Sequence, residues 1–254
     1  FCEKSAENQS IPNIYIETDD FITNYERFIK KADEDIQNYN ELFESDTAMN
    51  TLVIYPGRFQ PWHKGHKAVY DYLVKNFGSD NVFVATTNKV DPPRSPFTFS
   101  EKVQFMNLTG ISADSIVETR DPYKALEVVQ NYDPNTTRLI FAVSEKDMSE
   151  DPRFGFKTKK DGSPSYFQPY TGKNLMPFSN AKNADGTRAG HAYIYPVRDV
   201  QFSIAGQTIN SASQIRNLYK AADDEGREAI LHELYPNGGA LVDKIKRIFD
   251  AKLG

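Results

Sequence analysis

The sequence predicts an α/β protein: a doubly wound parallel sheet preceded by an N-terminal helical extension. Short apolar runs alternate with segments whose apolar residues recur at helical spacing, which is the pattern of repeated strand–helix units. The apolar runs are continuous rather than alternating, as expected for parallel strands that are covered on both faces. With 254 residues, of which 39% are hydrophobic and 26% charged, the chain is large enough for one sizeable core.

Residues 1–50 are expected to form an acidic N-terminal extension with one long amphipathic helix. They hold four Lys or Arg against twelve Asp or Glu, and apolar residues recur at helical spacing from Phe21 to Phe43. An apolar stripe of this kind needs a partner surface, so we expect it to join the chain to a second copy or to a larger assembly. The single cysteine, Cys2, leaves no intramolecular disulfide and fits a reducing compartment.

Residues 51–254 are expected to form the main domain. Its strands are predicted at 51–55, 81–86, 115–118, 138–143 and 192–197. Its helices are predicted at 64–77, 98–109, 122–132, 211–221, 224–234 and 239–251. Thr98 and Glu101 have the spacing of a capping box, and Asp121 before Pro122 is typical of an N-cap with proline at the first helical position.

A basic insert at about 150–190 interrupts this alternation. The segment is rich in Gly, Pro, Asn and aromatic residues, and residues 151–190 hold seven Lys or Arg against three Asp. A long insert in a compact domain is often a lid or a binding loop, and its positive charge suits an anionic substrate. A solvated loop with lysines fits the same composition equally well.

The most informative stretch is residues 57–66, GRFQPWHKGH, between the first predicted strand and the first predicted helix. The first N–H groups of a helix lack partners within the helix and face the positive end of its dipole, so they attract phosphate. His63 and His66 are three residues apart and share one face of the first turn. Gly65 between them lets a phosphate approach the backbone closely. The pattern predicts a phosphate-handling site.

A second stretch, residues 210–216 with the sequence NSASQIR, opens a later predicted helix. Ser211 is a good N-cap residue, and Ser211 with Gln214 has capping-box spacing. The hydroxyls of Ser211 and Ser213, with the guanidinium of Arg216 one turn later, are suited to binding the outer phosphates of a nucleotide. A helix cap followed by an exposed arginine is the alternative interpretation of the stretch alone.

Together these motifs resemble those of the HxGH nucleotidyltransferases. GRFQP followed by HxGH is most similar to the nicotinamide mononucleotide adenylyltransferase branch and its viral relatives, and the PFT at 96–98 is similar to the same branch. The 210–216 stretch resembles the ISSTxIR motif of the superfamily, with Asn210, Ala212 and Ser213 departing from it. The resemblance implies a Rossmann-like domain of the nucleotidylyl transferase type.

The reaction that this resemblance implies is transfer of a nucleoside monophosphate from ATP or CTP to a phosphate-bearing acceptor, with release of pyrophosphate. His63 and His66 would stabilise the transition state. Mg²⁺ would be held through the nucleotide phosphates, without a dedicated protein metal site. The partners expected are a nucleoside triphosphate and a small phosphorylated acceptor, with nicotinamide mononucleotide as the first choice and a cytidylyltransferase as the alternative.

Further residues follow from the resemblance and their positions beside predicted strand ends. Lys89 and Arg94 are expected to bind substrate phosphates. The residues expected to bind the nucleotide are Gly57, Arg58, Phe59, Gln60, Gly65, Ser144, Asp147, Ser211, Ser213 and Arg216. Plain loop capping is the alternative for Ser144 and Asp147, and a solvated loop charge is the alternative for Arg94.

Composition narrows the remaining possibilities. The net charge of −5 argues against general nucleic-acid binding, and no apolar run approaches the length of a membrane span. The sequence contains neither a GxGxxG dinucleotide motif nor a P-loop. We expect a cytoplasmic enzyme. A non-catalytic virion or structural component that keeps the fold is the alternative, because the chain also resembles nucleotidyltransferase-like proteins of large tailed phages.

Overall fold

The computed structural model describes residues 49–150, 191–209 and 211–254, and within 151–179 it describes 154, 156, 160, 162, 165–173 and 175–179. The chain divides into two compact units, Phe1–Ala48 and Met49–Gly254. The expected amphipathic helix, Cys2 and much of the expected basic insert lie outside the described residues, so the predictions made for them stay predictions.

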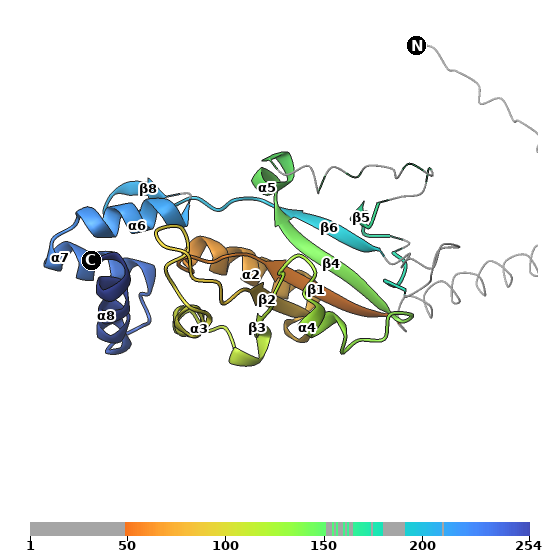
Figure 1. Ribbon diagram of the computed structural model, residues 1–254, viewed down its shortest axis with the longest axis horizontal. Coiled ribbons are helices and arrows are strands. Elements are labelled where there is room, and N and C mark those ends of the chain that lie inside the picture. The colour runs from red at the N-terminus through yellow and green to blue at the C-terminus, as the bar shows by residue number, and fades with distance from the viewer. Residues whose placement is uncertain are drawn as a thin grey trace, which may run out of the picture. The chain divides into compact units, whose positions relative to one another are not determined.

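The second unit is built on a six-stranded parallel sheet with strand order β3-β2-β1-β4-β6-β5 (Figure 1). The strands are β1 (Asn50–Pro56), β2 (Val82–Thr86), β3 (Ile116–Glu118), β4 (Thr137–Ser144), β5 (Phe167–Pro169) and β6 (Ala192–Val197). The chain order reverses between β1 and β4, which is the switch point of a doubly wound sheet. The predicted α/β fold with a parallel, Rossmann-like sheet is therefore confirmed.

The strands are buried on both faces of the sheet, as their continuous apolar sequences indicate. In β1, Val53 and Tyr55 belong to one apolar cluster, and Leu52 and Ile54 belong to the other. Successive side chains of a strand point to opposite faces, so each strand contributes to both cores. The first cluster is the larger and also takes in the C-terminal helices.

Most helices lie within about two residues of their predicted positions. They are α2 (Lys64–Phe77), α3 (Phe99–Leu108), α6 (Ala212–Ala221), α7 (Asp224–Leu234) and α8 (Leu241–Leu253), with short 3₁₀ turns at Ser79–Asn81 and Ala113–Ser115. Thr98 and Glu101 form the predicted capping box at the start of α3. Helices α6, α7 and α8 gather at one end of the domain (Figure 1). No helix among the described residues is long and apolar enough to span a membrane.

The helix predicted at 122–132 is wrong at its start and much too long. Helix α4 covers only Leu126–Val129, and its N-cap residue Ala125 is left-handed with φ 44°. The Asp121 carboxylate accepts from the Tyr123 N–H at 3.1 Å instead of capping a helix. Its carbonyl accepts from the N–H groups of Lys124 and Ala125. A turn built on Asp121 therefore replaces the predicted first helical turn.

Four short elements were not expected. They are β5, helix α5 (Glu145–Glu150), and a hairpin of β7 (Phe202–Ile204) and β8 (Gln207–Ile209). The hairpin turns at Ala205 and Gly206, with φ values of 48° and 74°. Two successive left-handed residues match the twist of paired strands, but alanine at the first position gives a weak sequence signal.

Candidate functional site

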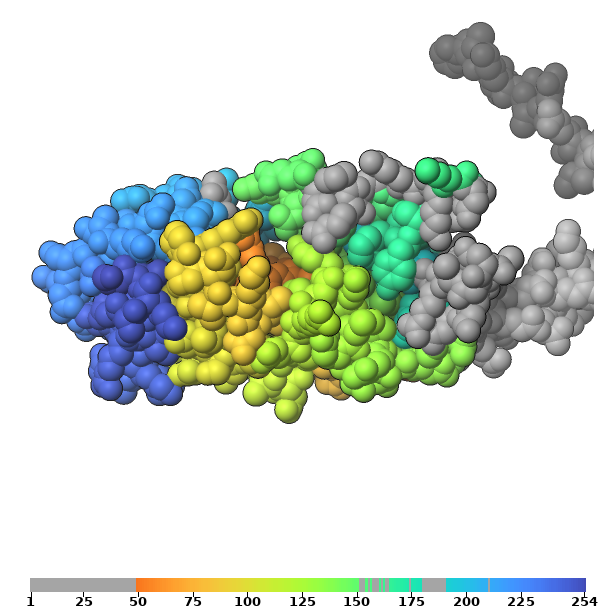
Figure 2. Space-filling view, viewed as in Figure 1, coloured from red at the N-terminus to blue at the C-terminus, as the bar shows by residue number. Residues whose placement is uncertain are grey.

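The site lies at the carboxyl end of β1, beside the switch point with β4. Residues 57–63 leave the strand and lead directly into α2, which begins at Lys64. In Figure 2 the surface is hollowed between the yellow segment that follows β2 and the green segments, and orange residues of the β1 region are visible at its floor. Ligands of open parallel sheets bind beyond the carboxyl ends at such a switch point.

The two histidines of the motif stack on each other. The ring centroids of His63 and His66 are 3.6 Å apart, with 18° between the ring planes. His63 is the N-cap residue of α2, and its Nδ1 accepts from the His66 N–H at 3.3 Å. An Nδ1 that accepts carries no proton, so neutral His63 carries its proton on Nε2. The sequence prediction that both residues share one face is confirmed.

Burial keeps both imidazoles neutral. It lowers the pKa of His63 to about 3, and His63 is only 5% exposed. Burial also lowers the pKa of His66 well below its usual value, and the neighbouring His63 lowers it further. The Nδ1 of His66 is buried and has no hydrogen-bond partner among the described residues. The pair therefore offers neutral hydrogen-bonding groups, one of which is unused.

The GRFQP side chains build the loop rather than line it. Phe59 adopts a left-handed φ of 49° and packs edge-on against Trp62 and His66. A Cβ on Gly57 would lie 2.6 Å from the Phe59 ring, so this position needs glycine. Gln60 donates to the Phe97 carbonyl and accepts from the Phe97 N–H, each at 2.8 Å. Packing and Phe97 occupy the Phe59 and Gln60 side chains, so a nucleotide contact here would use the main chain, and the expected contact stays a prediction.

Arg216 joins the two sequence motifs. Its Nη1 donates to the carbonyl oxygen of Gln60, so the start of α6 is held against the loop after β1. Burial lowers the pKa of Arg216, and the nearby charge of Arg58 lowers it further. Arg58 itself is exposed and forms no ion pair among the described residues. Two guanidinium groups within electrostatic reach of each other form an anion-binding environment.

The serines of the second motif cap α6. Ser211 is the N-cap residue, and its Oγ accepts from the Gln214 N–H at 3.4 Å and lies 3.0 Å from the Ser213 Oγ. The predicted N-cap is confirmed. Both hydroxyls lie at the N-terminus of α6, a ten-residue helix, and Arg216 lies in its second turn. Their expected contact with nucleotide phosphates stays a prediction.

Gly65 has a packing role that the sequence does not show. A Cβ there would lie 3.0 Å from the Phe202 ring and 3.0 Å from the Val200 carbonyl oxygen. The Phe202 ring centroid also lies 5.0 Å from that of His63. The Lys64 side chain reaches the same hairpin, where its Nζ donates to the Ser203 carbonyl at 2.9 Å. Phe202 of β7 and the Val200 carbonyl therefore fill the space where a Gly65 side chain would lie, and the expected approach of a phosphate to the Gly65 backbone stays a prediction.

The remaining predicted residues lie on exposed loops and helix starts. Lys89 and Arg94 are exposed on the segment that follows β2. The Ser144 Oγ accepts from the Asp147 N–H at 3.0 Å, which is the capping arrangement held open as the alternative. Asp147 is exposed on α5. Burial raises the pKa of Asp199, and the charge of Asp147 raises it further. The structure does not bring these four side chains into contact with the histidine pair.

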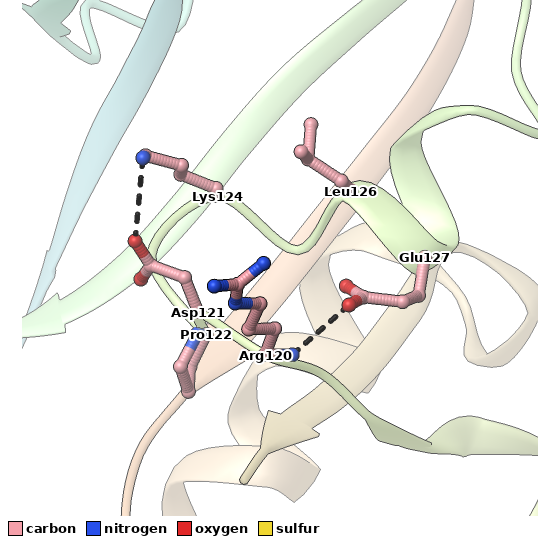
Figure 3. A pocket seen from close by; sticks show the side chains of 6 residues that line it. All are labelled: Arg120, Asp121, Pro122, Lys124, Leu126 and Glu127. Carbon is pink, nitrogen blue, oxygen red and sulfur yellow. Dashed lines mark hydrogen bonds and ion pairs between the residues drawn. The ribbon is translucent and has the colours of Figure 1, made fainter.

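Two adjoining pockets, of about 530 and 580 Å³, open beside the ends of β2 and β3. They share Arg120 and Glu127, and Figure 3 shows the Arg120 N–H bonded to the Glu127 carboxylate and Lys124 paired with Asp121. Thr119 lines the second pocket, and its buried hydroxyl has no partner among the described residues. The residues that line the two pockets are Thr87, Asn88, Lys89, Glu118, Thr119, Arg120, Asp121, Pro122, Lys124, Leu126 and Glu127.

Sequence comparison identifies the domain. The cytidylyltransferase-like family model matches residues 54–164, which include the end of β1, the histidine pair and both pockets. This match supports placing residues 54–164 in the nucleotidyltransferase superfamily. An uncharacterized protein of Aeropyrum pernix is 36% identical over 66 residues, which is 26% of this chain. Nicotinamide-nucleotide adenylyltransferase 1 of Sulfolobus acidocaldarius is 26% identical over 97 residues, or 35% of this chain. The matches span 37% and 55% of those relatives' own lengths.

Solved structures resemble the nucleotidyltransferase domain only distantly. A candidate nicotinate-nucleotide adenylyltransferase of Vibrio parahaemolyticus is 15% identical with a TM-score of 0.38, covering 81% of this chain and 98% of that one. The nicotinic acid mononucleotide adenylyltransferase of Plasmodium falciparum is 12% identical with a TM-score of 0.40, covering 81% and 100%. Because these scores are low, the likeness to the superfamily is carried by the sequence matches.

Sequence reasoning missed two residues that shape the site of the nucleotidyltransferase domain. Lys102 is fully buried in α3, although its position in the sequence resembles that of an ordinary solvated helix lysine. Phe202 packs against His63 from 139 residues downstream, in a hairpin with a weak turn signal. Apolar periodicity could have found neither residue, because both positions depend on contacts between distant segments.

Proposed function

We propose that the domain catalyses nucleotidyl transfer from a nucleoside triphosphate to a small phosphorylated acceptor. The observation that carries this proposal is that one loop, between β1 and α2, carries Arg58 and leads into two neutral, stacked histidines, while Arg216 is bonded to the Gln60 carbonyl of the same loop. Transfer of this kind needs orientation and charge stabilisation rather than a protein nucleophile. This group of donors suits a triphosphate better than it suits a neutral ligand.

In the proposed reaction, an acceptor phosphate oxygen attacks the α-phosphorus of the triphosphate. The bond from the α-phosphorus to the bridging oxygen of the β-phosphate breaks, and pyrophosphate leaves. His63 donates its Nε2 proton in a hydrogen bond to a phosphate oxygen. His66 is partly exposed and its Nδ1 is buried, so it is proposed to donate through its Nε2. Arg58 and Arg216 bind the leaving pyrophosphate. Neutral imidazoles stabilise charge here without transferring a proton.

The pockets beside β2 and β3 are proposed as the acceptor site. They adjoin the segment that carries Lys89, and they contain the Arg120 cation and the unpartnered Thr119 hydroxyl. These groups supply a positive charge for the acceptor phosphate and a hydrogen-bonding group for the rest of the molecule. Nicotinamide mononucleotide with ATP is the first choice, on the resemblance of the GRFQP and PFT motifs. CTP with an alcohol phosphate is the second, because the matching family model is cytidylyltransferase-like.

A divalent cation fits this site only through the nucleotide. Among the described residues, no group of three or more His, Cys, Asp or Glu lies close enough to hold a metal ion. Mg²⁺ commonly takes phosphate oxygens and water as ligands, so it would be bound with the triphosphate. When bound, Mg²⁺ neutralises phosphate charge. The phosphates are held and oriented by the side chains of Arg58, His63, His66 and Arg216.

The test is a screen for pyrophosphate release. ATP and CTP are each combined with Mg²⁺ and with nicotinamide mononucleotide, phosphopantetheine, glycerol 3-phosphate or phosphocholine. The His66→Ala variant should lower kcat about 10²–10³-fold, the usual effect of removing one preorganised donor. The His232→Ala variant is the matched control, since His232 is exposed on α7. If a nucleotide binds but no combination of nucleotide and acceptor releases pyrophosphate, a non-catalytic binding protein is favoured instead.

A further inference from the structure

Lys102 is a buried cation that the proposed reaction does not use. It lies on the inner face of α3 and has no exposed surface. Its Nζ donates to the Thr86 Oγ at 2.6 Å, to the Arg58 carbonyl at 3.3 Å and to the Thr87 carbonyl. A lysine ammonium has three N–H groups, so these three acceptors satisfy it completely.

The acceptors come from two segments that carry the phosphate-binding side chains. The Arg58 carbonyl belongs to the loop after β1, which leads to the histidine pair. Thr86 is the last residue of β2, and Thr87 follows it, two residues before Lys89. The hydroxyl of Thr86 also lies 3.4 Å from the Arg58 carbonyl, so it bridges the same two segments. Lys102 therefore holds together the carboxyl ends of two neighbouring strands.

The charges around Lys102 do not explain its burial as an ion pair. Glu118, at the end of β3, is the carboxylate that favours its charged form. On its own helix, Glu101 is occupied by the Thr98 N–H at 2.7 Å and by Lys252 of α8 at 3.5 Å. The Arg58 side chain adds a further positive charge on the loop that Lys102 binds. Burial outweighs Glu118 and lowers the pKa of Lys102 to about 8.

A buried cation of this kind works against stability. Removing an ammonium from water is unfavourable, and apolar side chains that replace a buried charge together with its partners often cause no loss of stability. The residue therefore has a better explanation in the site than in the fold. Its ammonium draws two loops toward one point, which an apolar side chain cannot do.

We propose that Lys102 is a positioning residue that sets the distance between the loop after β1 and the loop after β2, so that Arg58 on the triphosphate and Lys89 on the acceptor hold the two substrates at the right separation. The inference rests on the proposed function for its catalytic consequence. The brace itself can be tested without turnover.

The first experiment compares Lys102→Met with the wild type and with Lys75→Met, an exposed lysine on α2. Hydrogen exchange at residues 57–60 and 87–89 should become at least tenfold faster in Lys102→Met and stay unchanged in Lys75→Met. Unchanged exchange in Lys102→Met would overturn the brace, whatever the domain catalyses. Lys102→Met leaves the Thr86 hydroxyl and the Arg58 and Thr87 carbonyls without their donor, so it should also unfold at a lower urea concentration than the wild type at pH 7. A higher urea concentration would overturn the claim that Lys102 satisfies these acceptors.

The second experiment uses pH. The pKa of Lys102 is lower in the folded chain than in the unfolded chain, so the unfolded chain binds one more proton between pH 8 and about 10.5. The folding constant of the wild type should therefore gain up to about tenfold per pH unit over Lys102→Met in that range. A constant ratio between the two proteins would refute the buried charge.

Activity should change in the opposite direction to stability. If the domain transfers nucleotides, kcat of the wild type should fall as pH rises through 8, while Lys102→Met is about 10²-fold slower at pH 7 and lacks this step. An equal pH profile for both proteins would exclude positioning by the ammonium. Absence of turnover in the wild type would refute the proposed function alone, since the exchange experiment would still decide the brace.

Discussion

The neutral state of His63 makes the domain sensitive to acid in a way that can be calculated. His63 is 5% exposed, and burial holds its pKa at about 3, against about 6.5 in an unfolded chain. Between these values the unfolded chain binds one more proton than the folded chain. The stabilising effect of neutral His63 is therefore complete above pH 6.5 and is lost as pH falls toward 3.

The expected loss of stability follows from how far the pH lies below the pKa of His63 in the unfolded chain. At pH 4.5, about two units below the unfolded pKa, one such group lowers the free energy of unfolding by about 2.7 kcal/mol relative to pH 7.5. That is a large share of the about 5–15 kcal/mol that stabilises a typical domain.

Urea unfolding at pH 7.5 and 4.5, with wild type and His63→Asn, isolates this effect from the carboxylates common to both proteins. Asparagine keeps an N-cap acceptor for the His66 N–H but does not titrate. The wild type should lose about 2–3 kcal/mol more than the variant. Proton NMR of the His63 ring should show no titration between pH 8 and 5. A His63 pKa near 6.5 would refute both the burial argument and the neutral-donor mechanism.

Two further predictions concern the loop. Gln60→Ala leaves both main-chain groups of Phe97 unpaired in the core and should lower the free energy of unfolding by about 2–4 kcal/mol in urea titrations, whereas Gln104→Ala, on the adjacent helix, should change it by less than about 1 kcal/mol. Arg216→Met should weaken ATP binding about 10–100-fold in calorimetry, with Arg216→Lys intermediate; equal affinity for all three proteins would remove this guanidinium from the phosphate site.

Much of the architecture follows from the sequence because it depends on local patterns. Continuous apolar runs located the five main strands, and helical spacing with polar caps located α2, α3 and the three C-terminal helices. The motif at 57–66 determined a strand, a tight loop and a helix start in that order. Their spacing on one turn predicts that His63 and His66 share a face, and the structure adds that their rings stack. The same reasoning gave a wrong helix start at residue 122, because the Asp121 carboxylate can accept a hydrogen bond either at a helix N-terminus or in a turn, and here it does so in a turn.

Only the tertiary structure decided which motif side chains face a ligand. Gln60 is bonded to Phe97, 37 residues away, and Gly65 is covered by Phe202 of a distant hairpin. Arg216 reaches the loop after β1 across 156 residues, and Lys102 bonds the ends of two strands from inside the core. Residue type and spacing tell which groups could bind phosphate. Whether a side chain is free for that purpose depends on packing between segments that are far apart in the chain, because buried polar groups must find partners wherever the fold supplies them.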